Sequence, residues 1–419
     1  MLLDKADILR LLGTCDRMTT QKIVIEEGAL FNVLNHLQSA GLCGPVAVIY
    51  DNNTYAAAGE ARPAVDQQII LDPEGLHADE KAVEKALADL SPDIKTVIAI
   101  GSGTIHDISR YCAHERGAAF VSCPTAASVD GFCSNVAAMT WHGSKKTIPA
   151  VAPTLVVADL DIIAKAPIRL ARSGIGDILG KYAALADWKI ANILTGERYD
   201  ENIASVMAEA VDIVRASTDG IIEGNVKSYE KLIYGLVLSG LAMQAFGNSR
   251  PASGSEHHIS HLIEMHPQPL GISSSALHGE KVGVGTLLIS QEYHRFIDQC
   301  PCSLDFEYSK PDKRELEMYF GDLACAIEEE NKNDCLTGMD ISALLNHWVE
   351  ISSIVAAIPR SEELLPLYEN AGLMKSLEDI GVDEDKRAEL VFLSPLVRNR
   401  LTLARIMRCT VKKEVDKNG

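Results

Sequence analysis

Paired cysteines are missing from this sequence. Ten cysteines are scattered over the 419 residues, and no two of them have the CxxC spacing of a zinc ribbon or a dithiol redox motif. The closest pair, Cys300 and Cys302, has no second pair that could complete a metal site. Scattered cysteines are typical of proteins whose thiols stay reduced, so we expect a cytoplasmic protein.

Long apolar runs are also missing, and we expect no leader sequence. The most apolar uncharged stretch, residues 232–248, falls short of the ~20 residues that a membrane-spanning helix needs, and it contains internal glycines. The residues that follow Met1 are amphipathic and acidic, without the basic start, apolar centre and cleavage site of a signal peptide. We therefore expect no membrane span.

Positive charge is scarce. The chain has 39 Lys and Arg against 58 Asp and Glu, which gives a formal net charge of −19. Such a surface repels nucleic acids and anionic membranes, so both are excluded as partners. A small phosphorylated substrate stays possible, because it needs only a local positive site. With 47% apolar residues, the chain is long enough for two domains with separate cores.

The first 166 residues alternate between strand and helix patterns. Apolar runs predict strands at Pro45–Asp51, Gln67–Leu71, Thr96–Ile100, Ala118–Cys123 and Thr154–Ala158. A small hairpin is predicted at residues 139–148. Such alternation indicates a parallel sheet covered by helices, so residues 1–166 are predicted to form an α/β, Rossmann-like nucleotide-binding domain. From residue 167 onward the spacing is helical, and residues 167–419 are predicted to form an all-helical domain of about seven helices.

Three loops follow predicted strands, and ligands bind beyond the carboxyl ends of the strands in open parallel sheets. They begin at Asp51, Gly101 and Thr125. Asp51 is either an acid in a turn or a carboxylate that accepts a ribose hydroxyl. Asp130, in the third loop, is either the start of an Asx-turn or a functional carboxylate.

The second loop reads GSGTIHD. Gly101 and Gly103 allow the backbone to approach a phosphate, and a helix that starts at Thr104 favours an anion at its N-terminus. The loop is not a GxGxxG fingerprint, because Ile105 and His106 interrupt it. A plain tight turn would explain the glycines equally well.

Residues 253–286 are rich in histidine. Ser253 and Glu256 have the spacing of a capping box, which predicts that a helix begins there, and Pro267 should end it.

His257 and His261, four residues apart, share a face of that helix. Together with His278 they could hold a divalent metal, and Asp177 is the carboxylate that we expect to join them. No HExxH motif is present, so a purely structural histidine cluster remains an alternative.

Several motifs together resemble a known superfamily. The Gly-Ser-Gly loop, GIGDILGKY, HHISHLIE and LHGEKVGVGT are similar to the metal-dependent polyol dehydrogenases and dehydroquinate synthases. The stretches SCPTAASVDGFCS and RPASGSEHHISH resemble glycerol-1-phosphate dehydrogenases, including the bacterial form. The resemblance covers roughly residues 40–290, and the rest matches only as a helical tail. It implies a dehydroquinate synthase-like architecture with the active site in the cleft between the two domains.

The resemblance assigns roles by position. It implies metal ligands at Asp177, His257 and His278, catalytic roles for Asp177 and His261, and substrate contacts by Asp130, Asp177 and His261. His258 receives no role. The implied dinucleotide-binding residues are Asp51, Gly103, Thr104, Ile105, His106, Asp107, Thr125, Ala126, Ala127, Ser128 and Ser134.

The implied activity is the interconversion of dihydroxyacetone phosphate and sn-glycerol 1-phosphate with NAD(H) or NADP(H). One divalent metal, zinc, nickel or iron, would act as Lewis acid on the C2 oxygen. Arg250 and Lys281 are our candidates for the substrate phosphate. Asp51 favours NADH if it meets the ribose, since an acid repels a 2′-phosphate.

The resemblance also implies a homodimer and a possible role in phospholipid biosynthesis. The alternatives are a glycerol dehydrogenase that acts on an unphosphorylated polyol, a dehydroquinate synthase-like cyclase (a lyase), and a non-catalytic binding protein. Asp177 counts against the cyclase, because dehydroquinate synthases have Glu at this position.

Overall fold

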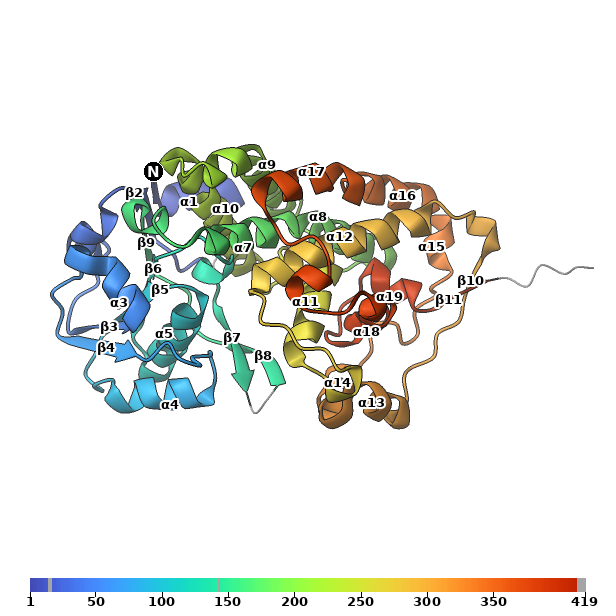
Figure 1. The fold of residues 1–419 in the computed structure, drawn as a ribbon, viewed down its shortest axis with the longest axis horizontal. Coiled ribbons are helices and arrows are strands. Elements are labelled where there is room, and N and C mark those ends of the chain that lie inside the picture. The colour runs from blue at the N-terminus through green and yellow to red at the C-terminus, as the bar shows by residue number, and fades with distance from the viewer. Residues whose placement is uncertain (14–16, 142–143, 413–419) are drawn as a thin grey trace, which may run out of the picture. The chain divides into compact units, whose positions relative to one another are not determined.

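The chain folds into two compact units. The computed structural model describes residues 1–13, 17–141 and 144–412 (Figure 1). Unit 1 contains Met1–Ile178 and Glu201–Ala252, and unit 2 contains Leu179–Asp200 and Ser253–Gly419.

The units differ from the predicted domains, 1–166 and 167–419, because two long helices pack with the sheet-bearing part. These are α9 (Glu201–Ile222) and α10 (Val226–Phe246), which both belong to unit 1. The assignment of the nucleotide to the first domain, and of metal and substrate to the second, stays a prediction.

A seven-stranded sheet forms the centre of unit 1. Its order is β1-β2-β9-β6-β5-β3-β4, and all pairs are parallel except β1 with β2. The parallel α/β arrangement predicted from the alternating pattern is therefore confirmed. The strands are β1 (Leu2–Asp4), β2 (Lys22–Glu26), β3 (Val46–Asp51), β4 (Gln67–Leu71), β5 (Thr96–Gly101), β6 (Ala119–Pro124) and β9 (Leu155–Asp159).

The sheet has a separate apolar core on each face. Successive strand residues point to opposite faces, so Ala47 and Ile49 of β3 lie in one core while Val48 and Tyr50 lie in the other. Both faces are buried, which explains why the strands read as continuous apolar runs. The other helices of unit 1 are α1 (Lys5–Leu12), α2 (Val33–Ser39), α3 (Asn52–Ala58), α4 (Glu80–Asp89), α5 (Gly103–Arg116), α6 (Leu160–Ile163) and α7 (Ile168–Leu179).

The predicted hairpin forms from β7 (Val136–Trp141) and β8 (Ser144–Pro149), which pair antiparallel. Its connecting residues 142–143 lie outside the described residues.

Unit 2 is helical, as the sequence predicts, apart from a short ribbon of β10 (Leu304–Phe306) and β11 (Thr410–Lys412). The estimate of about seven helices was too low, because predicted long helices are interrupted. Gly321, for example, takes a positive φ of 54° between α13 and α14. The helices are α8 (Lys181–Thr195), α11 (Ser255–Met265), α12 (His278–Ile297), α13 (Lys313–Phe320), α14 (Ala324–Glu330), α15 (Ala343–Asn346), α16 (Trp348–Ala356), α17 (Ser361–Ala371), α18 (Arg387–Leu393) and α19 (Leu403–Met407).

Among the described residues, no helix has the length and apolar character that crossing a membrane requires.

Candidate dinucleotide and metal sites

Unit 1 has a cavity where its strand order reverses. After β3 the chain continues to β4 on one side, and then returns to β5 on the other side of β3. Ligands bind beyond the carboxyl ends of strands at such a switch point. Asp51 ends β3 and Ser102 follows β5, and both line a cavity of about 980 Å³. Thr125 and Ala126, after β6, line the same cavity. The structure thus brings three of the predicted cofactor residues, Asp51, Thr125 and Ala126, to one place.

Packing requires glycine at position 101 of the second loop and leaves little space at position 103. A Cβ on Gly101 would lie 2.5 Å from the Cβ of Ile105, and one on Gly103 would lie 3.3 Å from Val129. Helix α5 begins at Gly103, and its N-cap Ser102 makes no side-chain capping bond. The tight-turn explanation therefore holds for Gly101, and the loop still delivers a helix N-terminus directly after a residue that lines the cavity.

Two further residues of this loop have structural partners. The His106 ring is buried, with Nδ1 2.9 Å from the Ser102 carbonyl oxygen and Nε2 2.8 Å from Ser122 Oγ. Burial lowers the pKa of His106 to about 3, so the ring is neutral. Asp107 forms an ion pair of 3.7 Å with Arg110. The side chain of His106 thus holds the loop, Asp107 pairs within α5, and the predicted cofactor contacts of both residues stay predictions.

The third loop bonds to the second loop and packs closely against α7. The Thr125 backbone N–H donates to the Gly101 carbonyl at 2.9 Å, which joins the second and third loops. Ser128 Oγ lies 2.7 Å from Ser102 Oγ. A Cβ on Gly174 of α7 would lie 2.1 Å from the Ala127 carbonyl oxygen, so only glycine permits this close approach.

Ser134 lies in the turn that follows, where its N–H donates to the Gly131 carbonyl and its Oγ accepts from the Val136 N–H. The structure gives Ser134 a turn-forming role, and its predicted contact with cofactor stays a prediction.

Asp130 and Asp177 contact each other inside unit 1. The Asp130 N–H donates to Asp177 Oδ2 at 3.0 Å, and the Asp130 carboxylate accepts from Ser239 Oγ at 2.7 Å. Both carboxylates are buried. The Asp130 side chain therefore bonds to α10, 109 residues away, which the Asx-turn interpretation did not anticipate.

In unit 2, the start of α11 differs from the prediction. The N-cap is Gly254, not Ser253. Buried Asp187 of α8 accepts from the Ser255 N–H at 2.9 Å, and Glu256 accepts from the Gly254 N–H. The predicted capping box of Ser253 and Glu256 is therefore wrong, because a carboxylate from a distant helix satisfies the first turn. The helix ends at Met265, shortly before Pro267, as predicted.

The three predicted histidines lie together in unit 2. Ring centroids of His257 and His278 are 5.4 Å apart, those of His257 and His261 6.0 Å, and those of His261 and His278 5.9 Å. Gly285 of α12 permits this proximity, since its Cβ would lie 2.7 Å from the Glu256 carbonyl oxygen of α11. The two histidine-bearing helices therefore pack almost backbone to backbone.

Carboxylates hold the two predicted ligand imidazoles. His257 Nδ1 lies 2.6 Å from Glu256 Oε1, and His278 Nδ1 lies 2.9 Å from Glu264 Oε1. A carboxylate that accepts from Nδ1–H fixes the tautomer and leaves Nε2 as a lone-pair donor, the usual arrangement of metal-binding histidine. Asp177, His257 and His278 are side chains of the types that hold a divalent metal ion.

Sequence reasoning missed the role of Glu256, which it assigned to a cap, and of Glu264. The signal was present, because both acids flank the histidines within one helix.

His258 is buried, His261 is half-buried, and both are neutral. Burial, and then the positive charge of Arg400, lower the pKa of His258 well below its usual value. Burial, and then Arg398, do the same to the pKa of His261. Among the described residues, neither ring nitrogen of His258 has a hydrogen-bond partner.

The two cations predicted to meet phosphate are both buried. Lys281 Nζ lies 3.2 Å from Glu264 Oε1, so its charge is balanced by an acid that also holds His278. Arg250 is 1% exposed, in unit 1.

Comparison with known proteins identifies relatives of this chain. Residues 24–167 match a family model described as iron-containing alcohol dehydrogenase. A glycerol-1-phosphate dehydrogenase [NAD(P)+] of Bacillus licheniformis is 36% identical over 305 residues, which cover 69% of this chain and 76% of the relative. The enzyme of the same name from Bacillus subtilis is 32% identical over 377 residues, with 86% and 84% covered.

A solved structure of a probable glycerol dehydrogenase from Sinorhizobium meliloti has a similar fold. The TM-score is 0.60 at 18% identity, with 90% of this chain and 88% of that chain covered. This likeness supports the predicted architecture of a parallel α/β part followed by a helical part.

Proposed function

The chain belongs to the glycerol-1-phosphate dehydrogenase family, and we propose that it interconverts sn-glycerol 1-phosphate and dihydroxyacetone phosphate with NAD(H) or NADP(H). Within the structure, the observation that carries this proposal is the pair of imidazoles His257 and His278, each held through Nδ1 by its own carboxylate. That arrangement supports a metal centre rather than a structural histidine cluster.

We assign the metal to Asp177, His257 and His278. One carboxylate and two neutral imidazoles suit zinc, nickel or iron, and leave positions for substrate. A metal held by these residues would supply Lewis-acid polarisation of the C2 oxygen, and a bound nicotinamide would supply the hydride exchange with C2.

The chain's own residues would orient substrate and handle its proton. A neutral His261 has one nitrogen that donates and one that accepts, so it suits a hydrogen bond to a substrate hydroxyl and the relay of its proton. Among the described residues, His261 Nδ1 is buried and has no hydrogen-bond partner, which supports a contact with substrate. Asp130 is proposed to contact substrate as well.

The cofactor is proposed to occupy the cavity of unit 1. Asp51 Oδ1 accepts from the Thr54 N–H at 2.7 Å and so caps α3, while the residue also lines the cavity. A carboxylate in this position accepts ribose hydroxyls and repels a 2′-phosphate, so we expect a preference for NADH. We assign the other cofactor contacts to residues 103–107 and 125–128 of the second and third loops and to Ser134.

We also propose that the protein is a homodimer and that it is located in the cytoplasm. The nine cysteines within the described residues are free thiols, which supports a reducing compartment. Light scattering of the purified protein tests the dimer, and a mass of one chain would contradict it.

The activity is tested with metal-reconstituted enzyme, NADH and NADPH, and two ketones in parallel. Dihydroxyacetone phosphate should be strongly preferred to dihydroxyacetone, and the product should be the 1-phosphate enantiomer. Preference for the unphosphorylated ketone would instead indicate a glycerol dehydrogenase.

A further inference from the structure

A C-terminal segment, residues 394–401, runs along the histidine-bearing helix. The short 3-10 helix Ser394–Leu396 packs against α11. Arg400 Nη1 donates to the Ser253 carbonyl oxygen at 2.8 Å, directly before α11 begins. Both elements belong to unit 2. The segment lies in the tail that the family resemblance matched only as helical, yet it contacts the helix that carries His257 and His261.

This segment brings two positive charges to His258 and His261. Among the charged groups, Arg398 lowers the pKa of His261 most, and Arg400 lowers the pKa of His258 most. Both arginines are half-buried residues. A guanidinium taken partly out of water is stabilised most by an anion that accepts two parallel N–H groups, as carboxylates and phosphates do.

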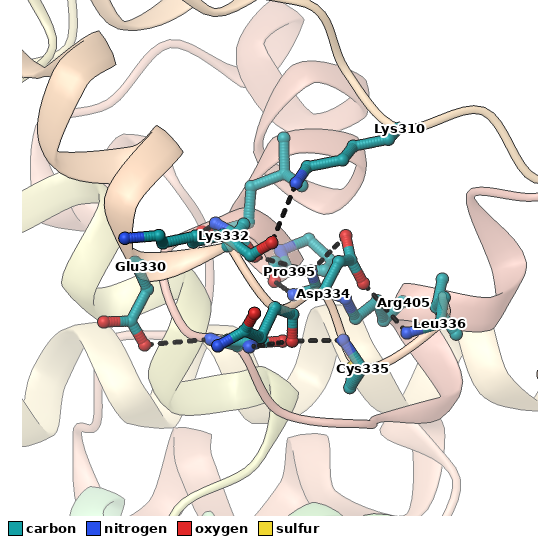
Figure 2. A network of polar contacts seen from close by, with 12 residues as sticks. Lys310, Glu330, Lys332, Asp334, Cys335, Leu336, Pro395 and Arg405 are labelled. Carbon is teal, nitrogen blue, oxygen red and sulfur yellow. Dashed lines mark hydrogen bonds and ion pairs between the residues drawn. The ribbon is translucent and has the colours of Figure 1, made fainter. Parts of the chain in front are cut away.

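Arg405 fixes the backbone of this segment. It is fully buried, and its Nη1 donates to the carbonyl oxygens of Pro395 at 2.6 Å and Arg398 at 2.8 Å. Its Nη2 donates to Asn331 Oδ1 at 2.5 Å and Asp334 Oδ2 at 2.9 Å. Figure 2 shows these contacts around Arg405 and Asp334. Nη1 thereby holds the segment, and Nη2 anchors the same guanidinium to Asn331 and Asp334.

Asn399, between the two arginines, is fixed as well. Its N–H donates to Glu330 Oε1 at 3.0 Å, and its side-chain amide donates to the Asn333 carbonyl at 2.7 Å and accepts from the Cys335 N–H at 2.9 Å. A backbone held on both sides of Arg398 reduces the freedom that its side chain must lose on binding. Such preorganisation is typical of binding sites.

We propose that Arg398 and Arg400 bind the phosphate group of the substrate. The proposal rests on the proposed function and adds the residues that distinguish a phosphorylated from an unphosphorylated ketone. Lys281, the earlier candidate in unit 2, forms an ion pair with Glu264.

Arg398→Gln and Arg400→Gln test the proposal. We measure kcat/KM for dihydroxyacetone phosphate and for dihydroxyacetone, and take their ratio. Losing one charge-assisted contact to phosphate should lower this ratio about 10- to 100-fold. Inorganic phosphate should inhibit the wild type competitively, and its inhibition constant should rise by a similar factor in each variant. Arg398→Lys keeps the positive charge but loses the two parallel N–H donors of the guanidinium. Its ratio of kcat/KM values should therefore lie between those of the wild type and Arg398→Gln.

Arg387→Gln is the matched control. Arg387 is a partly exposed arginine of unit 2 that pairs with Glu384, and its loss should leave the ratio unchanged. A wild-type preference for the phosphorylated ketone that both glutamine variants retain within about twofold would overturn the arginine proposal alone. A wild type without that preference would overturn the proposed function, and the arginine assignment with it.

Discussion

The two candidate sites are built from different parts of the chain. In unit 1, the loops around the cavity are shaped by backbone contacts, such as the bond from the Thr125 N–H to the Gly101 carbonyl. In unit 2, the histidine site depends on side chains, because His257 and His278 are each held by one particular carboxylate. The first site is therefore defined by the backbone that surrounds the cavity, and the second by the functional groups of particular side chains.

This difference predicts different responses to mutation. Substitution of a ligand or its carboxylate removes a chemical group that no neighbour replaces. Substitution of a side chain at the cavity rim leaves the backbone N–H groups in place, so it should adjust cofactor preference rather than abolish binding. Three substitutions, at His257, Glu264 and Asp51, test this difference between the two sites.

His257→Ala should have the largest effect. Loss of one imidazole should remove the metal and lower kcat at least ~10³-fold, or about 4 kcal/mol of transition-state stabilisation. Metal content by elemental analysis and kcat should fall together, while the circular dichroism spectrum stays native. Normal metal content with full activity would sink the assignment.

His347→Ala is the control for that experiment. His347 also pairs with a glutamate, Glu350 at 3.4 Å, but the pair is exposed. Its loss should leave metal content and kcat unchanged, because this His–Glu pair is exposed to solvent and lies outside the proposed metal site.

Glu264→Gln should have an intermediate effect. The substitution keeps the size of the side chain but removes the charge that supports His278 Nδ1–H and balances Lys281. Loss of such a partner should weaken metal affinity about 10- to 100-fold, measured by competition with a chelator. Glu292→Gln, which removes the partner of Arg295 on α12, should leave the affinity unchanged. Equal metal affinity in both variants would show that Glu264 does not support a ligand.

The local parts of the fold were predictable from the sequence. The predicted strand at Gln67–Leu71 is β4, and the helical spacing of His257 and His261 placed both rings near one another because that spacing is local. The start of α11 was not predictable in this way. Its cap comes from Asp187, 68 residues before Ser255, and only tertiary packing brings them together.

Within the candidate site, only the local part followed from the sequence, because His257 and His261 lie four residues apart on one helix. The metal-binding role of Asp177, His257 and His278 stays a prediction. The position of Arg398 and Arg400 could not be predicted from the sequence, because it depends on the contact of Arg405 with Asp334, 71 residues away. A lone arginine in a helical tail gives no sequence signal of a binding role.

Asp51→Ser should have the smallest effect on activity. It tests whether a side chain at the cavity adjusts cofactor preference without abolishing cofactor binding. Serine is as good an N-cap as aspartate, so Thr54 N–H keeps its partner and the free energy of unfolding should change by no more than about 0.5 kcal/mol. The negative charge is lost, however, and like charges near a surface repel by roughly 1–4 kcal/mol at 4 Å. The ratio of kcat/KM for NADPH to that for NADH should therefore rise about tenfold. Asp161→Ser removes another acid that lines the cavity, and an equal shift there would mean that the general charge of the cavity, rather than Asp51 at the ribose, sets the preference.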